Sequence, residues 1–367
     1  MRRLLVYIYQ RWFLVLFSRF FLKKYEFLLK QKNPNDFSIT EIAQSQSLKY
    51  IGNNVIRINS CTDYFPILLG GSPLPFRKRK EADFFYIYGS GIDLFKYILL
   101  RDSFRFNIPR VFIEDGFLRS VDLPYAEPGV SMLLDDVSIY YDARSPSRLE
   151  LMLNSNQVPS VVELERAKNV MSRIRELKIT KYNLAPIYVP SIGSRKRKKI
   201  LVIDQAYQDF SIPFGLASDE SFQEMLEAAK NEHPDKDIIV KTHPEAFRGG
   251  RKGYFTSLKK DKNIIPFTDP ICPYSLIEIV DEVYCVTTQM GFEALMCGKK
   301  VHCFGMPFYG GWGVTEDRIN CPRRIRKRSV EEIFHFAYIV YSRYMNPKTG
   351  YRCEIEEVID YLAEIRA

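Results

Sequence analysis

Residues 282–313 (EVYCVTTQMGFEALMCGKKVHCFGMPFYGGWG) constrain the fold most strongly, because they have the pattern of a complete strand, helix and strand. The stretch 282–286 is short and apolar, as expected of a buried strand. Gly291 opens a helix with one apolar face, and Gly298 ends that helix before a second strand over 301–304. Two strands joined through a helix predict a parallel α/β sheet.

The start of this helix is a candidate phosphate site. Thr287 and Thr288 place hydroxyl groups beside the free N–H groups of a helix N-terminus, which attract anions. After the second strand, residues 307–313 (PFYGGWG) combine three glycines with three aromatic residues. Such a loop suits a planar base or a sugar ring. The alternative, a βαβ unit that binds no ligand, is equally compatible with the spacing.

Polar residues follow three predicted strands in the second half of the chain. These strands cover 199–204, 237–240 and 282–286. The polar residues after them are, in chain order, Gln205, Asp209, Ser211, Lys241, His243, Thr287 and Thr288. In an open α/β sheet the carboxyl ends of parallel strands lie along one edge, where ligands bind. Each residue alone is equally explained by a structural role, and their repeated placement is the argument for a site.

The first half of the chain repeats this pattern. A predicted strand over 110–113 runs directly into Glu114 and Asp115, and Arg119 follows a few residues later. A carboxylate at that position can act as a general acid or base if its pKa is raised. The alternative is that the two acids only cap the next turn.

The charge of the chain favours anionic partners. The formal net charge is +9 and the pI is about 9.0, which suits nucleic acid, a phosphorylated or carboxylated small molecule, or an acidic membrane. A nucleic-acid partner is not expected, because the basic residues do not form one stripe interleaved with aromatic residues. The seven cysteines include no CxxC pair, which indicates reduced thiols in the cytoplasm.

Residues 1–32 predict a basic amphipathic helix. Large apolar residues alternate there with arginine and lysine, and neither proline nor glycine occurs. The longest uncharged apolar run, 12–17, is far shorter than the roughly 20 residues that span a bilayer. The composition fits a helix that lies on an anionic membrane surface. The alternative is a helix that docks on its own protein.

The chain resembles the capsular polysaccharide β-Kdo glycosyltransferase family in five motifs: EDGFLRS at 114–120, DQAYQDFSI at 204–212, KTHPE at 241–245, TTQMGFEAL at 287–295 and PFYGGWG at 307–313. The resemblance covers roughly residues 80–325. It implies an α/β protein of variant GT-B fold, with two Rossmann-like domains that face a cleft. It also implies CMP-β-Kdo as donor and retention of the β configuration. The best-known members carry two such modules in tandem, whereas this chain has one.

By the same motifs, Asp209 resembles the nucleophile that forms a covalent Kdo adduct, and Glu114 resembles the acid/base carboxylate. His243 resembles a donor-site residue beside the leaving phosphate. Retention through double displacement requires one nucleophile and one acid/base group, in agreement with these roles. The residues expected to bind the donor are Arg119, Gln205, Ser211, Lys241, Thr287, Thr288, Gly291, Phe292 and Glu293. No metal ion or other cofactor is expected, since lysine, hydroxyl and helix N–H groups can stabilise the leaving phosphate.

The expected organisation has five parts. They are the basic helix over 1–32, an acceptor-side domain over 33–182, a proline- and serine-containing linker over 183–198, a donor domain over 199–328, and C-terminal helices over 329–367. In the last part we expect helices over 330–344 and 355–365. The basic run at 323–328 is expected to be a solvated edge or a contact for anionic lipid.

The expected function is transfer of Kdo to a glycan or lipid-linked glycan during biosynthesis of a capsule or another surface polysaccharide. We expect the protein to be cytoplasmic and peripheral to the inner membrane, and to contact other capsule assembly proteins. The alternative is a module without catalytic activity, which binds a CMP-sugar or a glycan and acts as a scaffold for capsule assembly and export.

Overall fold

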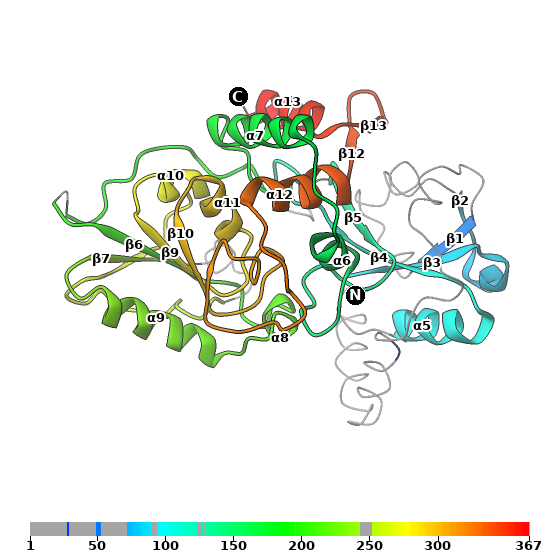
Figure 1. Cartoon of the computed structure of the whole chain (residues 1–367), viewed down its shortest axis with the longest axis horizontal. Helices are drawn as coiled ribbons and strands as arrows, with labels where there is room; N and C mark the ends of the chain where they lie inside the picture. Colours follow the sequence, from blue (N-terminus) through cyan, green and yellow to red (C-terminus); the bar gives the residue numbers. More distant parts are fainter. Residues whose placement is uncertain are drawn as a thin grey trace, which may run out of the picture.

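The computed structural model describes residues 28, 49–52, 72–89, 94–122, 127, 129–194, 196–242 and 252–366. The chain forms two β-sheets with helices packed on them (Figure 1). The helix expected over 1–32, apart from Leu28, and the candidate His243 lie outside the described residues.

The first sheet has seven strands in the order β13-β12-β5-β4-β3-β1-β2. Its strands are β1 (Lys49–Gly52), β2 (Ser72–Pro73), β3 (Phe84–Tyr88), β4 (Arg110–Asp115), β5 (Ser131–Asp135), β12 (Ser342–Asn346) and β13 (Tyr351–Cys353). Strands β1 to β4 pair in parallel, whereas β5, β12 and β13 are antiparallel to their neighbours. The first half of the chain also contains the 3₁₀ helix η2 (Phe76–Glu81) and helices α5 (Leu94–Phe106), α6 (Arg148–Asn154) and α7 (Val161–Glu176).

The second sheet has six strands, all parallel, in the order β11-β10-β9-β6-β7-β8. They are β6 (Lys199–Ile203), β7 (Asp237–Lys241), β8 (Ile264–Phe267), β9 (Glu282–Cys285), β10 (Lys300–Cys303) and β11 (Glu316–Asp317). The helices between them are α8 (Ser211–Phe214), α9 (Glu220–Glu232), α10 (Pro273–Ile277) and α11 (Met290–Met296). Strands buried on both faces need continuous apolar sequences, which explains runs such as KILVI in β6. The predicted α/β class with two Rossmann-like units is confirmed.

The C-terminal segment differs from the expected pair of helices. The first helix, α12 (Val330–Phe334), begins with a capping box on Ser329 and passes into a π-helical turn over His335–Tyr341. The chain then enters strand β12, where the helix over 330–344 was predicted to continue. Pairing of β12 with β5 in the first sheet overrides the local helical pattern. Helix α13 (Ile355–Arg366) agrees with the second predicted helix and lies beside α7 (Figure 1).

Around Asp135 and Asp136 the sequence predicts a hairpin or tight turn that joins 130–134 to 138–142, but the second of these segments does not form a strand. These residues form turns, and β5 pairs instead with β4 and β12. Strand β4 also extends further than predicted, so that Glu114 and Asp115 lie within the strand and not in the turn after it.

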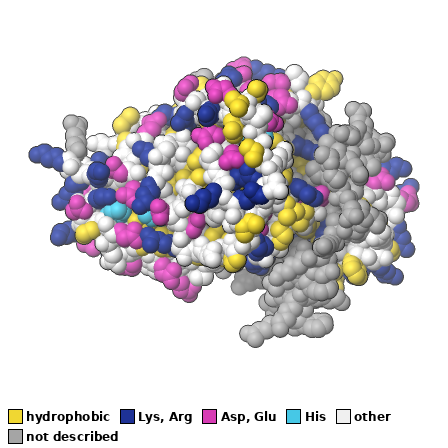
Figure 2. Space-filling model, viewed as in Figure 1, with side chains coloured by type: hydrophobic (Ala, Val, Ile, Leu, Met, Phe, Trp, Pro, Cys, Tyr) yellow, Lys and Arg dark blue, Asp and Glu magenta, His cyan; other side chains and the backbone are white. Residues whose placement is uncertain are grey.

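A shared hydrophobic core joins the first unit, which is built on the seven-stranded sheet, to the second unit, which is built on the six-stranded sheet. The ring of Phe117, which follows β4, stacks on Tyr338 at 4.6 Å and lies 4.8 Å from the ring of Phe308 in the second unit. Basic and acidic side chains are intermixed on the visible face of the described region (Figure 2). Within the described ranges, the structure contains no helix that is long and apolar enough to cross a bilayer.

Candidate active site at the strand ends

Three of the predicted residues form one hydrogen-bonded group at the carboxyl ends of β6 and β9. The Gln205 amide nitrogen donates to Thr287 Oγ1 at 3.0 Å, and Gln205 Oε1 accepts from the Thr287 N–H at 2.8 Å. Ser211 Oγ lies 3.0 Å from Thr287 Oγ1. Because β6 and β9 are parallel neighbours in the sheet, their ends bring these side chains together.

Asp209 lies in the turn between β6 and α8 and is attached to this group. Its Oδ1 accepts from the Ser211 N–H at 2.8 Å, and its own N–H donates to the Ala206 carbonyl at 3.2 Å. The preceding Gln208 has a φ of 61°, a left-handed conformation that is uncommon for a residue with a side chain. The turn therefore holds the Asp209 carboxylate, which is partly exposed, in a defined position at the sheet edge.

Glu114 lies near the end of β4 in the first unit. The Tyr141 hydroxyl donates to Glu114 Oε2 at 2.9 Å. Burial raises the pKa of Glu114, and the adjacent Asp115 raises it further, while Lys181 and the Tyr141 hydrogen bond act in the opposite direction. A carboxyl group whose pKa is raised toward neutral is suited to proton transfer.

The two candidate acids share one neighbour, Tyr140. Burial raises the pKa of Tyr140 to about 12, and the negative charges of Glu114 and Asp209 both contribute to that increase. A backbone hydrogen bond also connects the two units here, from the Ala143 N–H to the Phe214 carbonyl at 2.8 Å. Glu114 and Asp209 therefore lie within electrostatic reach of the same side chain, although they belong to different units.

Sequence reasoning missed Tyr140, Tyr141 and Lys181. The two tyrosines lie in the segment 138–142, after the predicted turn, and Lys181 lies just before the predicted linker. No local pattern distinguishes such residues, because the contact of Tyr141 with Glu114 depends on how the turn after β5 folds back toward β4, and Lys181 comes from a separate segment after α7.

Arg119 is held inside the protein. Its side chain is fully buried, and its Nε lies 3.0 Å from Asp115 Oδ2. Its Nη1 donates to Ser120 Oγ at 2.9 Å and to the Glu127 carbonyl at 3.1 Å. These contacts give Arg119 a structural role, and its predicted contact with a donor carboxylate stays a prediction.

Lys241 and Thr288 also form internal contacts. Lys241 Nζ donates to the carbonyls of Thr242 and Asp269 at 3.1 Å each, and burial lowers the pKa of Lys241 to about 8. Thr288 Oγ1 accepts from the Met290 N–H at 3.3 Å, in the first turn of α11. The donor contacts predicted for these two residues stay predictions.

The first turn of α11 is explained by packing. A Cβ atom on Gly291 would lie 2.1 Å from the Tyr309 hydroxyl, so close approach of Tyr309 requires glycine. Phe292 is fully buried, with its ring 5.2 Å from that of Phe308. Glu293 is 4% exposed, and burial raises its pKa to about 8. The structure therefore gives Gly291 and Phe292 packing roles, and the donor contacts of Gly291, Phe292 and Glu293 stay predictions.

The glycine- and aromatic-rich loop at 307–313 is not an open platform. Phe308, Tyr309 and Trp312 are all buried, and the Trp312 indole N–H donates to the Phe308 carbonyl at 2.8 Å. The Tyr309 hydroxyl donates to the Thr288 carbonyl at 2.6 Å. The aromatic residues thus pack inside the protein beside the strand-end site, and binding of a base or a sugar ring by this loop stays a prediction.

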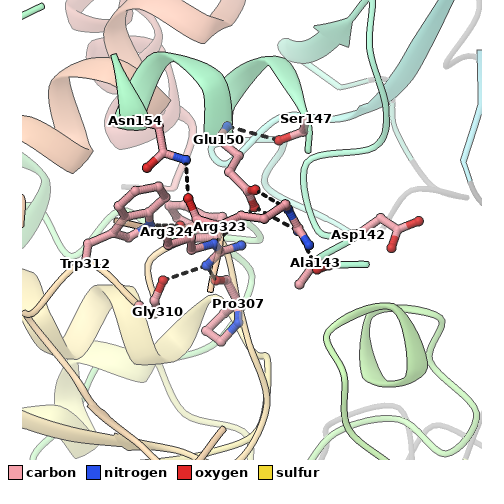
Figure 3. A network of polar contacts seen from close by, with 12 residues as sticks. Asp142, Ala143, Ser147, Glu150, Asn154, Pro307, Gly310, Trp312, Arg323 and Arg324 are labelled. Carbon is pink, nitrogen blue, oxygen red and sulfur yellow. Dashed lines mark hydrogen bonds and ion pairs between the residues drawn. The ribbon is translucent and has the colours of Figure 1, made fainter. Parts of the chain in front are cut away.

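The basic run at 323–328 forms hydrogen bonds with the same loop inside the protein. Arg324 is buried and donates to the carbonyls of Pro307 and Gly310 at 2.5 and 2.6 Å. Its Nε also donates to Glu150 of α6 at 3.1 Å, and Arg323 donates to the same carboxylate at 2.9 Å (Figure 3). Arg323 and Arg324 thus tie the two units together, which corrects the expectation of a solvated edge or a lipid contact for these two residues, whereas Arg326 and Lys327 of the same run are exposed.

The described residues include no group of three or more histidine, cysteine, aspartate or glutamate side chains that could hold a metal ion. We therefore propose no metal site in that part of the chain.

Comparison with known proteins identifies the family. Residues 164–345 match the model of the family described as capsule polysaccharide biosynthesis protein. The capsule polysaccharide modification protein LipA of Neisseria meningitidis serogroup B is 42% identical over 271 residues, which are 71% of this chain and 38% of LipA. The chain thus spans about two fifths of the length of that relative.

Two solved structures of KpsC from Thermosulfurimonas dismutans are also similar. The one described as a β-Kdo 2,4 transferase is 37% identical, with a TM-score of 0.80 over 86% of this chain and 98% of that chain. The one described as a β-Kdo 2,7 transferase is 26% identical, with a TM-score of 0.62 over 88% of this chain and 100% of that chain. The chain therefore belongs to the capsule polysaccharide biosynthesis family that includes KpsC.

Proposed function

We propose that this chain is a retaining β-Kdo transferase that uses CMP-β-Kdo and acts in the biosynthesis of a capsule or another surface polysaccharide. The family match and the similarity to both KpsC structures support a role of the Kdo-transferase type. The greater similarity to the 2,4 transferase, in identity and in TM-score, supports a 2→4 linkage to the acceptor. The acceptor is a glycan or glycolipid, and the reaction takes place at the cytoplasmic face of the inner membrane.

The observation that carries the proposal is that the charges of Asp209 and Glu114, which belong to different units, both act on the same side chain, Tyr140. In the first step, a carboxylate oxygen of Asp209 attacks the anomeric carbon of Kdo, the bond from that carbon to the phosphate oxygen breaks, and CMP leaves with the electron pair. In the second step, Glu114 removes the proton from the acceptor hydroxyl. The acceptor oxygen then attacks the anomeric carbon and displaces Asp209. Two inversions at one carbon give net retention.

The experiment that tests this function incubates the protein with CMP-Kdo, generated in situ, and a soluble octyl glycoside of Kdo. We expect release of CMP and formation of a disaccharide with a β-(2→4) linkage, identified by NMR spectroscopy. A β-(2→7) product would overturn the proposed linkage but not the donor. If neither CMP release nor product occurs with this or any lipid-linked glycan acceptor, the scaffold alternative becomes the better explanation.

Tyr141→Phe tests the role of Glu114 as a base. The Tyr141 hydrogen bond favours the ionised carboxylate, so its loss raises the pKa of Glu114 further. A base with a higher pKa is deprotonated only at higher pH. We therefore expect the acid limb of the transfer rate to move up by about 0.5 to 1 pH unit, since a hydrogen bond is worth about 1 kcal/mol.

The pH profile of Tyr351→Phe, in which an exposed hydroxyl is removed, is the control. An equal loss of rate at every pH in Tyr141→Phe, with the acid limb unmoved, would show that the hydroxyl only supports the local structure.

A further inference from the structure

Two large aromatic side chains flank Asp209 and stay exposed. Tyr207 is 43% exposed and Phe210 is 41% exposed, and both belong to the turn between β6 and α8. Single exposed apolar residues are common on protein surfaces and need no functional explanation. This pair is different because it lies on both sides of the candidate nucleophile in the chain.

The backbone of this turn is ordered by hydrogen bonds. The Tyr207 N–H donates to the Lys252 carbonyl at 2.7 Å, and an isolated β-bridge pairs Ala206 with Gly253. On the other side, the Ser211 N–H donates to Asp209 Oδ1. The two aromatic rings are therefore presented by a fixed backbone, as a binding surface requires.

Further rings extend this surface in both directions. The Tyr207 ring lies 5.2 Å from that of Tyr254 in the second unit. The Phe210 ring lies 6.2 Å from Phe214, which lies 6.2 Å from Tyr141, the residue that donates to Glu114. A row of aromatic side chains thus connects the surroundings of Asp209 with those of Glu114.

We propose that Tyr207 and Phe210 form an acceptor subsite, in which the apolar face of a sugar ring stacks on the exposed aromatic rings. This inference rests on the proposed function and assigns the part of the site that receives the glycan. An aromatic ring covers the C–H face of a sugar without competing for its hydroxyl groups, one of which must react. An acceptor sugar held next to Asp209 would bring its reacting hydroxyl toward the anomeric carbon of the Kdo that is bound to Asp209.

Exposed aromatic side chains also occur where a protein rests on a membrane, but the sequence of this turn argues against that partner, although the Arg144 guanidinium lies 3.8 Å from the centre of the Phe214 ring further along the row. The stretch 204–216 (DQAYQDFSIPFGL) contains two aspartates and neither lysine nor arginine. Anionic lipid attracts basic segments, so this turn is unsuited to such a surface. The uncharged C–H face of a sugar ring is the better match.

The test measures the dissociation constant and the KM for the octyl glycoside of Kdo in Tyr207→Ala, Phe210→Ala and Tyr207→Phe. We expect each alanine variant to bind the glycoside more weakly, so that its dissociation constant and its KM both rise by about 5- to 20-fold. Tyr207→Phe keeps the ring and is expected to stay within about twofold of the original protein. Phe104→Ala removes an exposed aromatic ring from α5, far along the chain from Tyr207 and Phe210, and is the matched control.

Both side chains are exposed, so the variants are expected to fold, and thermal melting checks this. Unchanged affinity for the glycoside in both alanine variants would overturn the subsite, whatever the transfer activity. Loss of binding to phosphatidylglycerol vesicles with unchanged glycoside affinity would also overturn it, in favour of a membrane contact. If the original protein binds the glycoside through these rings but transfers no Kdo, the subsite stands and the proposed enzyme function fails.

Discussion

Asp209→Asn is expected to reduce Kdo transfer by at least about 10³-fold, because it removes the nucleophile of the proposed first step. The asparagine keeps an oxygen that accepts from the Ser211 N–H, so the turn after β6 stays in place. Intact-protein mass spectrometry after incubation with CMP-Kdo provides the measurement. We expect a mass gain of one Kdo residue in the original protein and none in Asp209→Asn.

Glu114→Gln gives the opposite result in the same experiment. The first step needs no proton transfer to the phosphate, so the adduct on Asp209 still forms, but the acceptor hydroxyl is no longer deprotonated. The adduct is therefore expected to accumulate, and transfer to fall by about 10² to 10⁴-fold. Asp235→Asn, in an exposed turn, is the charge-matched control and is expected to behave as the original protein.

A mass gain that persists in Asp209→Asn would show that a residue other than Asp209 is the nucleophile. Transfer without any adduct in Glu114→Gln would argue for a direct displacement at one face of the sugar.

The sequence predicted the strand ends of the second unit well, for a physical reason. Each strand is a short apolar run, and parallel neighbours necessarily end at the same edge. Gln205, Ser211 and Thr287 therefore meet although 82 residues separate the first from the last. Arg119 shows the limit of this reasoning, because a guanidinium at the edge of a site has the same sequence pattern as one that is buried against Asp115.

The loop at 307–313 shows a related limit. Glycines and aromatic residues together fit an open binding loop, and they equally fit a tight turn whose rings fill the core. The deciding partner, Arg324, donates to backbone carbonyls, which carry no sequence signal. Likewise, strand β12 forms because it pairs with the edge of β5. The local sequence preference of residues 330–344 contains no information about that pairing.

The largest loss of stability is expected from Glu150→Ala. Glu150 is 4% exposed and accepts from Arg323 and from the buried Arg324 (Figure 3). Removal of one partner from a buried ion pair leaves the other charge without compensation, which costs about 3 to 5 kcal/mol. We expect the melting temperature to fall by several degrees, measured by calorimetry, whereas Glu224→Ala on the exposed face of α9 stays within about 0.5 kcal/mol of the original protein.

The double variant Glu150→Ala, Arg324→Met separates the ion pair from the packing. If the cost arises from the uncompensated charge of Arg324, the double variant loses less stability than the sum of the two single variants. Arg324 also donates to the loop that carries Tyr309, whose hydroxyl donates to the Thr288 carbonyl at 2.6 Å. Glu150→Ala is therefore expected to weaken donor binding as well as stability, and a variant that melts and binds CMP as the original protein does would show that this junction does not support the site.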